Sequence, residues 1–135
     1  MSAYERKIQD YDEAIRLDPQ DASAYRNRGT AYGFLGQHQR AGQDYDEAIR
    51  LNPQDAFVYF NRGVTYSNLG QHQRAIQDFD EAIRLDPPRL AEVYYNRGNE
   101  YKNLGQYAQA SQDFDEAIRL NSQDATAYNN RGVAY

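Results

Sequence analysis

The chain has 135 residues, enough for one small domain or one run of short modules. It contains no cysteine, which excludes disulfides, thiolate nucleophiles and cysteine-based zinc or iron-sulfur sites. Lys and Arg number 15 against 20 Asp and Glu, and the net charge of -5 argues against a general nucleic-acid binder and against binding to anionic lipid surfaces.

Membrane insertion is not expected either. The longest apolar stretches are far below the roughly 18 to 20 residues that span a bilayer. The opening residues, Met-Ser-Ala-Tyr-Glu-Arg, lack the apolar region of a signal peptide. We therefore expect the chain to be soluble, with the cytoplasm as the favoured compartment.

The first predicted element is a helix over about 3–18, and it contains the segment Gln-Asp-Tyr-Asp-Glu-Ala-Ile-Arg-Leu. This nine-residue segment recurs, with Tyr or Phe in third place, starting at Gln9, Gln43, Gln77 and Gln112. Each copy belongs to an amphipathic helix with an i, i+4, i+7, i+8 apolar stripe, as in Ala41, Tyr45, Ala48 and Ile49.

A second pattern alternates with the first. It is Tyr-x-Asn-Arg-Gly-x-x-Tyr, at residues 25–32, 59–66, 94–101 and 128–135, and its glycines lie 34, 35 and 34 residues apart. The pattern predicts another helix, in which glycine lets a neighbouring helix come close. Periods of this length indicate a solenoid whose units bury their apolar faces by stacking.

Turn residues separate the helices. Leu-Gly at 35–36, 69–70 and 104–105 predicts a helix end followed by a left-handed turn. Prolines follow the second helix of each period, at Pro19, Pro53 and Pro87. Aspartates predicted to cap the next first helix are Asp21, Asp55 and Asp124.

These motifs, together with Ala-x-x-x-aromatic at a 34-residue period, resemble the tetratricopeptide repeat (TPR) family over the whole chain. The resemblance implies an all-α fold, a right-handed α-solenoid of antiparallel helix pairs with about eight helices. It divides 1–135, as a single TPR domain, into the second helix of a partial repeat, three whole repeats and the first helix of a partial repeat: 1–21, 22–55, 56–90, 91–124 and 125–135.

The chain departs from the family pattern at several positions. Arginine replaces the usual leucine, and aspartate occupies a usually apolar position of the second helix; the residues are Arg28, Arg62, Arg97 and Arg131, and Asp10, Asp44, Asp78 and Asp113. We expect these to form compensating ion pairs, with ligand contact as the alternative. The second departure is one inserted residue within 87–90, predicted to bend the stack locally. Gly42 stands where the next repeat has Ile76, at a cost of roughly 1 kcal/mol in helix propensity.

Charge pairs within the second helices are also expected. An acid four residues before an arginine stabilises an exposed helix by about 0.2–0.5 kcal/mol. The predicted pairs are Asp46 with Arg50, Asp80 with Arg84, and Asp115 with Arg119.

No motif indicates catalysis or a cofactor. His38 and His72 occupy a repeat position that is elsewhere tyrosine, so we expect packing residues, and no second ligand lies at metal-binding spacing. The acidic cluster of Asp10, Asp12 and Glu13 lacks the glycine turn and loop of a calcium site. The repeated tyrosines are predicted to be core residues and not base-stacking platforms. We expect a protein that is not an enzyme and needs no metal or cofactor.

In the TPR family the first helices line a concave face that binds peptide segments. By that resemblance, Asn27, Asn61, Asn96 and Asn130 form a column of carboxamides able to hold a peptide backbone. The alternative is that each amide bonds to its own helix.

Positions that vary between repeats are the candidates for selecting a partner: Arg26, Phe34, Phe57, Phe60, Tyr95 and Lys102. We expect Phe60 and Tyr95 to be exposed in the groove and to receive an apolar side chain, with packing on each other as the alternative. Arg26 and Lys102 are candidates for acidic groups. The basic clamp of chaperone-binding members is incomplete, because Thr30 replaces an asparagine and the third repeat has Glu92 and Asn96.

The leading functional hypothesis is a non-catalytic scaffold that binds a peptide or protein segment of unknown identity, without nucleic acid or membrane. The alternative is a homo-oligomer that associates head to tail, or by exchange, through unpaired terminal helices. In that case the first helix at 125–135 of one molecule completes a repeat with the opening second helix of another. A piece of a longer array is the simpler explanation of such ends.

Overall fold

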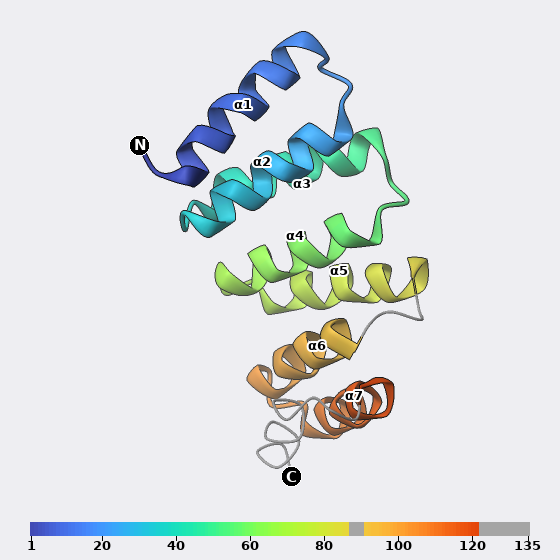
Figure 1. Ribbon diagram of the computed structural model, residues 1–135. Coiled ribbons are helices and arrows are strands. Elements are labelled where there is room, and N and C mark those ends of the chain that lie inside the picture. Colours follow the sequence, from blue (N-terminus) through green and yellow to red (C-terminus); the bar gives the residue numbers. More distant parts are fainter. Residues whose placement is uncertain (87–90, 122–135) are drawn as a thin grey trace.

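The computed structural model describes residues 1–86 and 91–121 (Figure 1). Within those ranges every regular element is an α-helix, which confirms the all-α prediction. The helices are α1 (Ala3–Leu17), α2 (Ala22–Phe34), α3 (His38–Leu51), α4 (Ala56–Asn68), α5 (His72–Leu85), α6 (Ala91–Asn103) and α7 (Tyr107–Leu120). The expected eighth helix, at 125–135, lies outside the described residues.

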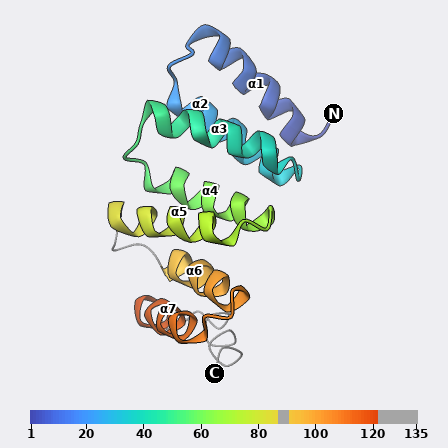
Figure 2. The same ribbon diagram turned by 180° about the vertical axis from the view of Figure 1, so that it is seen from behind.

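The helices are stacked in chain order, with α1 and α7 at opposite ends (Figures 1 and 2). The first helices α2, α4 and α6 each pair with the second helix that follows, α3, α5 and α7 respectively. Helix α1 is a second helix at the end of the stack. In the described ranges, none of the helices combines the length and apolar character that a membrane crossing needs.

The helix boundaries follow the predicted signals. Asp21 accepts a hydrogen bond from the backbone N–H of Ala24 at 3.2 Å, and Asp55 accepts one from Phe57 at 3.0 Å. The glycines that end the first helices have φ of 75–76°, which confirms the left-handed turns at Gly36, Gly70 and Gly105. Asp124 lies outside the described residues.

Each helix pair is joined by a glycine packed on an aromatic ring. Gly63 of α4 lies so close to Phe79 of α5 that a Cβ on the glycine would be 2.6 Å from the ring. Gly98 has the same relation to Phe114, at 2.6 Å, and Gly29 to Tyr45, at 2.9 Å. Phe79 and Phe114 are fully buried as a result. The predicted role of the glycines is confirmed.

The arginine before each glycine forms the expected ion pair with its own repeat. Arg62 donates from Nε and Nη2 to both carboxylate oxygens of Asp78, at 2.9 and 2.8 Å. Arg28 with Asp44 and Arg97 with Asp113 repeat this geometry. Burial raises the pKa of Asp78 and Asp113 while these hydrogen bonds oppose it, so each carboxylate depends on its guanidinium.

The same arginines also cross the boundary between repeats. Arg62 donates from Nη1 to Asp46 of the preceding second helix at 3.0 Å, and Arg28 donates to Asp12 at 2.9 Å. Arg97 donates to Asp80 at 2.8 Å, across the connection that holds the inserted residue. The insertion at 87–90, to which the predicted local bend belongs, lies outside the described residues.

The predicted i, i+4 pairs of Asp46 with Arg50 and of Asp80 with Arg84 are wrong. Asp46 is bound by Arg62 of the next repeat, and Arg50 pairs with Glu47, one turn earlier. Arg84 likewise pairs with Glu81 and Arg119 with Glu116, while Asp80 is bound by Arg97. The physical reason is that stacking brings a cation from the next repeat to the aspartate, and an adjacent glutamate remains for the exposed arginine.

The tyrosines of the first helices flank the same arginines. The guanidinium carbon of Arg62 lies 5.8 Å from the ring centre of Tyr59 and 5.7 Å from that of Tyr66. Arg97 lies in the same way between Tyr94 and Tyr101. Each guanidinium is therefore held by two carboxylates and two ring faces, which makes the arginine the centre of each repeat.

Alanine at two of the glycines should have opposite effects. Gly63→Ala forces its methyl group into the Phe79 ring and should destabilise the fold by about 1–3 kcal/mol. At Gly42 the nearest side-chain atom, Thr65 Cγ2, would lie 3.8 Å from the new Cβ, so Gly42→Ala should stabilise by about 0.5–1 kcal/mol. Denaturant unfolding measures both, and equal effects would contradict the packing described.

Removing one member of the buried pair should cost more than removing both. Arg62→Leu leaves the Asp78 carboxylate, 7% exposed, without its partner and should destabilise the fold by about 2–4 kcal/mol. The double variant Arg62→Leu, Asp78→Leu should recover most of that loss. If the losses simply add, the pair is not the compensating unit we describe.

Candidate peptide-binding groove

Three adjoining hollows run along α2 and form one trough. All three are lined by Thr30, and α2 is flanked by α1 on one side and α4 on the other. The hollow between the N-terminal halves of α2 and α4 is lined by Arg26, Asn27, Thr30, Phe57 and Asn61. We call the trough between α2 and α4 the α2–α4 groove.

Two of the four predicted asparagines meet in this groove. Asn27 and Asn61 come from equivalent positions of α2 and α4 and line the same hollow. Among the described residues, the side-chain amides of Asn27, Asn61 and Asn96 make no hydrogen bond, which removes support for the alternative that they bond to their own helices. Asn96 does not line the groove, and Asn130 lies outside the described residues.

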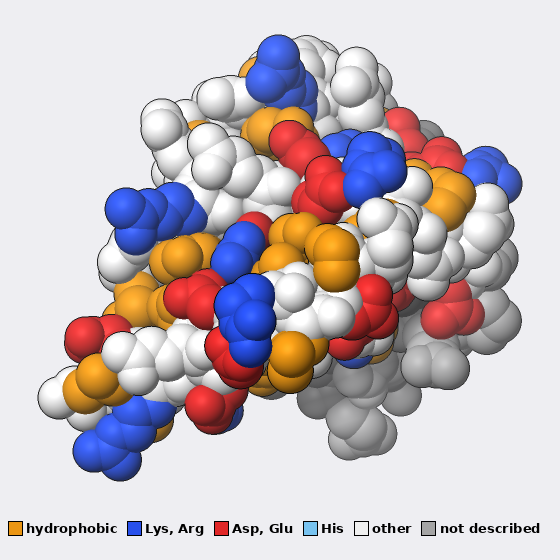
Figure 3. All heavy atoms as spheres, turned by 90° about the horizontal axis from the view of Figure 1, so that it is seen from above, with side chains coloured by type: hydrophobic (Ala, Val, Ile, Leu, Met, Phe, Trp, Pro, Cys, Tyr) orange, Lys and Arg blue, Asp and Glu red, His pale blue; other side chains and the backbone are white. Residues whose placement is uncertain are grey.

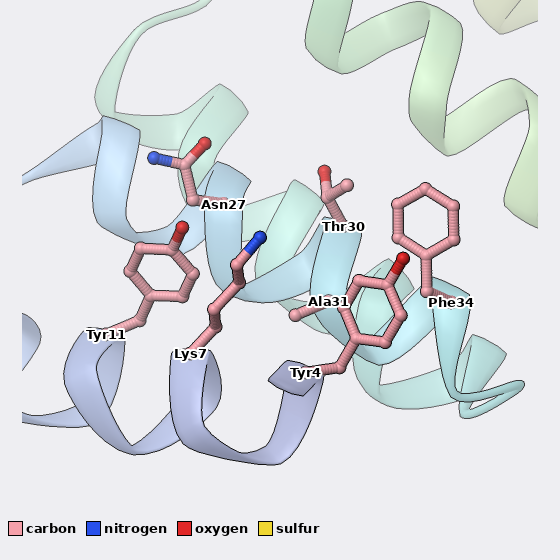
Figure 4. A pocket seen from close by; sticks show the side chains of 7 residues that line it. All are labelled: Tyr4, Lys7, Tyr11, Asn27, Thr30, Ala31 and Phe34. Carbon is pink, nitrogen blue, oxygen red and sulfur yellow. The ribbon is translucent and has the colours of Figure 1, made fainter. Parts of the chain in front are cut away.

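Two exposed phenylalanines supply apolar surface to the trough. The Phe57 side chain lines the hollow with the asparagines and is 62% exposed. Phe34, at the end of α2, is 66% exposed although its ring stacks on Tyr4 of α1 with 4.9 Å between centroids (Figure 4). Exposed aromatic rings beside unpaired amides are the composition expected of a surface that binds protein.

Phe60 and Tyr95 are less exposed than the sequence predicts. Both are half-buried, and each packs against the core ring of its own repeat. The ring centres of Phe60 and Phe79 are 5.9 Å apart, and those of Tyr95 and Phe114 are 6.1 Å apart. They do not pack on each other. Each lies on the first helix close to the glycine that contacts the core ring of its repeat, so its own ring is drawn toward the core. Contact with a partner stays a prediction.

The charge of Arg26 is already neutralised. Its Nη1 donates to Asp55 at 3.1 Å, linking α2 to the residue that caps α4. The pair spans the end of the α2–α4 groove, so this arginine is not a free site for an acidic group. Lys102, in the last turn of α6, does not line the groove.

Thr30 joins the floor of the groove to the core. Its hydroxyl donates to the carbonyl oxygen of Arg26 and lies 3.1 Å from the hydroxyl of Tyr45, whose pKa is raised by burial. Thr30 is not among the predicted binding residues, although the sequence places it where chaperone-binding members carry a clamp asparagine. Its spacing of three residues from Asn27, which puts both on one helix face, was the available signal.

The two histidines have different surroundings in the stack. His72 Nδ1 pairs with the buried carboxylate of Glu100 across α5 and α6, so this residue binds a polar partner where the sequence predicts only packing. His38 lines the groove beside Thr30 and Tyr45. In residues 1–86 and 91–121, no group of three or more His, Asp or Glu residues is placed to hold a metal ion.

Comparison with known families identifies the repeats. The sequence pattern of the tetratricopeptide repeat matches residues 22–55, 56–88 and 91–124, and a related TPR repeat pattern matches residues 3–36. No protein among the curated sequences matches the chain.

Solved structures with the same fold include three whose sequences are 25–30% identical to this chain. The Arabidopsis OM64 TPR domain is 30% identical, with a TM-score of 0.81, over 84% of this chain and 93% of that one. YrrB, described as a TPR protein with an unusual peptide-binding site, is 25% identical, with a TM-score of 0.85, over 98% of this chain and 68% of YrrB. The second TPR domain of human RPAP3, solved with the HSP70 peptide SGPTIEEVD, is 25% identical, with a TM-score of 0.79, over 84% of this chain and 93% of the RPAP3 domain.

Proposed function

Because the chain belongs to the tetratricopeptide repeat family, we propose that it is a non-catalytic scaffold that binds an extended peptide segment of another protein in the α2–α4 groove. The observation that carries this proposal is the pair of unbonded amides, Asn27 and Asn61, in one hollow. Peptide binding by YrrB and RPAP3, as their descriptions state it, supports the same class of function.

The amides suit a peptide main chain. Each carboxamide offers a donor and an acceptor, which is what an extended backbone requires from a partner. Asn27 and Asn61 occupy matching repeat positions, so they would engage the backbone at successive points along the groove. Main-chain contacts of this kind give affinity without selecting a sequence.

Selection would come from the neighbouring side chains. Phe57 offers an exposed ring beside the amides, and Phe34 offers another at the far end of α2. With Arg26 held by Asp55, the groove favours aliphatic or aromatic side chains over acidic ones. This separates the proposed ligand from the acidic peptide bound by RPAP3.

Two groove variants and one matched control test the proposal. A peptide array would first identify binders of the intact chain, and fluorescence anisotropy would then give affinities. Asn61→Ala and Phe57→Ala should each weaken binding by about 10-fold or more, equivalent to about 1.4 kcal/mol. Gln43→Ala changes an exposed residue of α3 outside the groove and should leave affinity unchanged. Equal affinities for all three variants would place the peptide elsewhere.

A second variant tests the role of the Arg26–Asp55 pair. Asp55→Asn keeps a residue that can cap α4 but removes the carboxylate that neutralises Arg26. Binding of peptides with an acidic residue should then strengthen by about 2- to 5-fold, as for one partly exposed ion pair. Affinity for uncharged peptides should stay the same. A gain for both peptide classes would show that charge is not the cause.

A further inference from the structure

The C-terminal half of the α2–α4 groove contains a hydroxyl that the next two repeats do not supply. Tyr45 of α3 stands where those repeats have Phe79 and Phe114. Its side chain is buried, at 3% exposure, and an edge of its ring packs on Gly29, so its hydroxyl end is the part that reaches the hollow it lines. We call this hollow between α2 and α4 the Tyr45 hollow. The side chains and glycine that matter in it are Thr30, Gly33, Phe34, Tyr45, Asn61 and Asn68.

The directions of two hydrogen bonds leave the Tyr45 oxygen able to accept a third. Thr30 has one hydroxyl proton, which it donates to the backbone carbonyl of Arg26 at 3.1 Å. In the 3.1 Å contact between the two hydroxyls, the proton therefore comes from Tyr45. Burial raises the pKa of this phenol, so it keeps that proton at neutral pH. Among the described residues nothing donates to the Tyr45 oxygen, which is left as an acceptor at the hollow.

The rest of the hollow suits one uncharged aromatic side chain. Phe34 lines it and is 66% exposed, although its ring also stacks on Tyr4 on the α1 side (Figure 4). Charged side chains of both signs are spread over the face in Figure 3, but none of the described residues that line this hollow is Asp, Glu, Lys or Arg. Its volume of about 250 Å³ is below the roughly 300–1,000 Å³ of sites that hold a whole drug-sized ligand, so it has room for a side chain.

An amide donor completes the match. Asn68 lies two helical turns after Asn61 on the same face of α4, and both line the hollow. In the part of the chain that the structure describes, the Asn68 amide makes no hydrogen bond. A phenol hydroxyl can donate to the Tyr45 oxygen and accept from this amide, whereas an indole N–H can only donate and a phenyl ring does neither. Tyrosine is therefore the aromatic side chain whose polar atom is satisfied in both roles.

We propose that the Tyr45 hollow is the subsite that receives a tyrosine side chain of the bound peptide. The tyrosine ring stacks on Phe34, and its hydroxyl donates to the Tyr45 oxygen and accepts from the Asn68 amide. The inference names the side chain that the groove selects, so it rests on the proposed peptide binding. Because Phe79 and Phe114 have no hydroxyl, the subsite belongs to the first repeat and fixes where along the groove the tyrosine lies.

Gly33 keeps this hollow open. A Cβ built on Gly33 would meet no atom within 4 Å, while the equivalent positions of the next repeats carry Ser67 and Lys102. A larger side chain at Gly33 would therefore enter the hollow without disturbing the core. It would also remove a glycine from a helix, which favours folding. Gly33→Leu is thus a blocking variant that spares the fold, and Ser67→Leu makes the same change one repeat later, outside the hollow.

Two small probes test the subsite on the intact chain. N-acetyltyrosine amide and N-acetylphenylalanine amide differ by one hydroxyl, and NMR titration gives their affinities. The tyrosine probe should bind wild type about 3- to 10-fold more tightly, as for one or two net hydrogen bonds. Tyr45→Phe installs the residue of the other repeats and should remove this preference by weakening the tyrosine probe alone. Gly33→Leu should weaken both probes at least 10-fold, and Ser67→Leu should leave both unchanged.

Several results would overturn the inference. They are a tyrosine probe that does not bind wild type at millimolar concentration, equal affinities for the two probes, a preference that survives in Tyr45→Phe, and unchanged binding to Gly33→Leu. A tryptophan probe that binds more tightly than the tyrosine probe would do so too. Circular dichroism of each variant would establish that it is folded, so that lost binding is not lost structure.

Peptides separate this inference from the proposed function. In peptides that bind the intact chain, changing a tyrosine to phenylalanine should weaken binding to wild type about 3- to 10-fold and leave binding to Tyr45→Phe unchanged. Peptides that bind in the groove without any preference for tyrosine would contradict the subsite and leave the proposed function standing. Probes that behave as expected on a chain that binds no peptide would support the subsite and contradict the proposed function.

Discussion

The close approach of glycine to an aromatic ring governs the rest of this structure. At Gly63 there is no space for a Cβ above Phe79, so α4 and α5 come together at a distance that other residues would prevent. The adjacent Arg62 is thereby brought to Asp78 of its own repeat and to Asp46 of the preceding one. One dipeptide thus fixes both the pairing of helices and the stacking of repeats.

This packing also determines which side chains remain for binding. The arginine and glycine face the second helices, and the asparagine just before the arginine faces the trough. Asn27 and Asn61 meet because α2 and α4 repeat that arrangement. The groove is therefore a consequence of the core contacts, and its polarity depends on which groups the core leaves unbonded. Arg26 illustrates this, since its guanidinium is already paired with the carboxylate of Asp55.

Periodicity explains how much of the structure the sequence predicts. The helices, their glycine turns, the Asp21 and Asp55 caps and the pairing of Arg28 with Asp44 all follow from local pattern within one repeat. Contacts between repeats are harder to predict from the sequence, because they depend on how the repeats stack on one another. The sequence predicts that Asp46 pairs with Arg50 in its own helix, whereas Arg62 of the next repeat binds it. Phe60 was expected to be exposed because its nearness to Phe79 depends on the helix pairing and not on its own position.

The most direct test of the account is the peptide affinity of Gly63→Ala, measured at a temperature where the variant remains folded. The substituted residue does not line the groove, but it sets the distance between α4 and α5 and so the position of Asn61 and Phe57. We predict an affinity reduced about 3- to 10-fold, which is about 0.6–1.4 kcal/mol. An unchanged affinity in a folded but destabilised variant would contradict the claim that the glycine contact positions the groove.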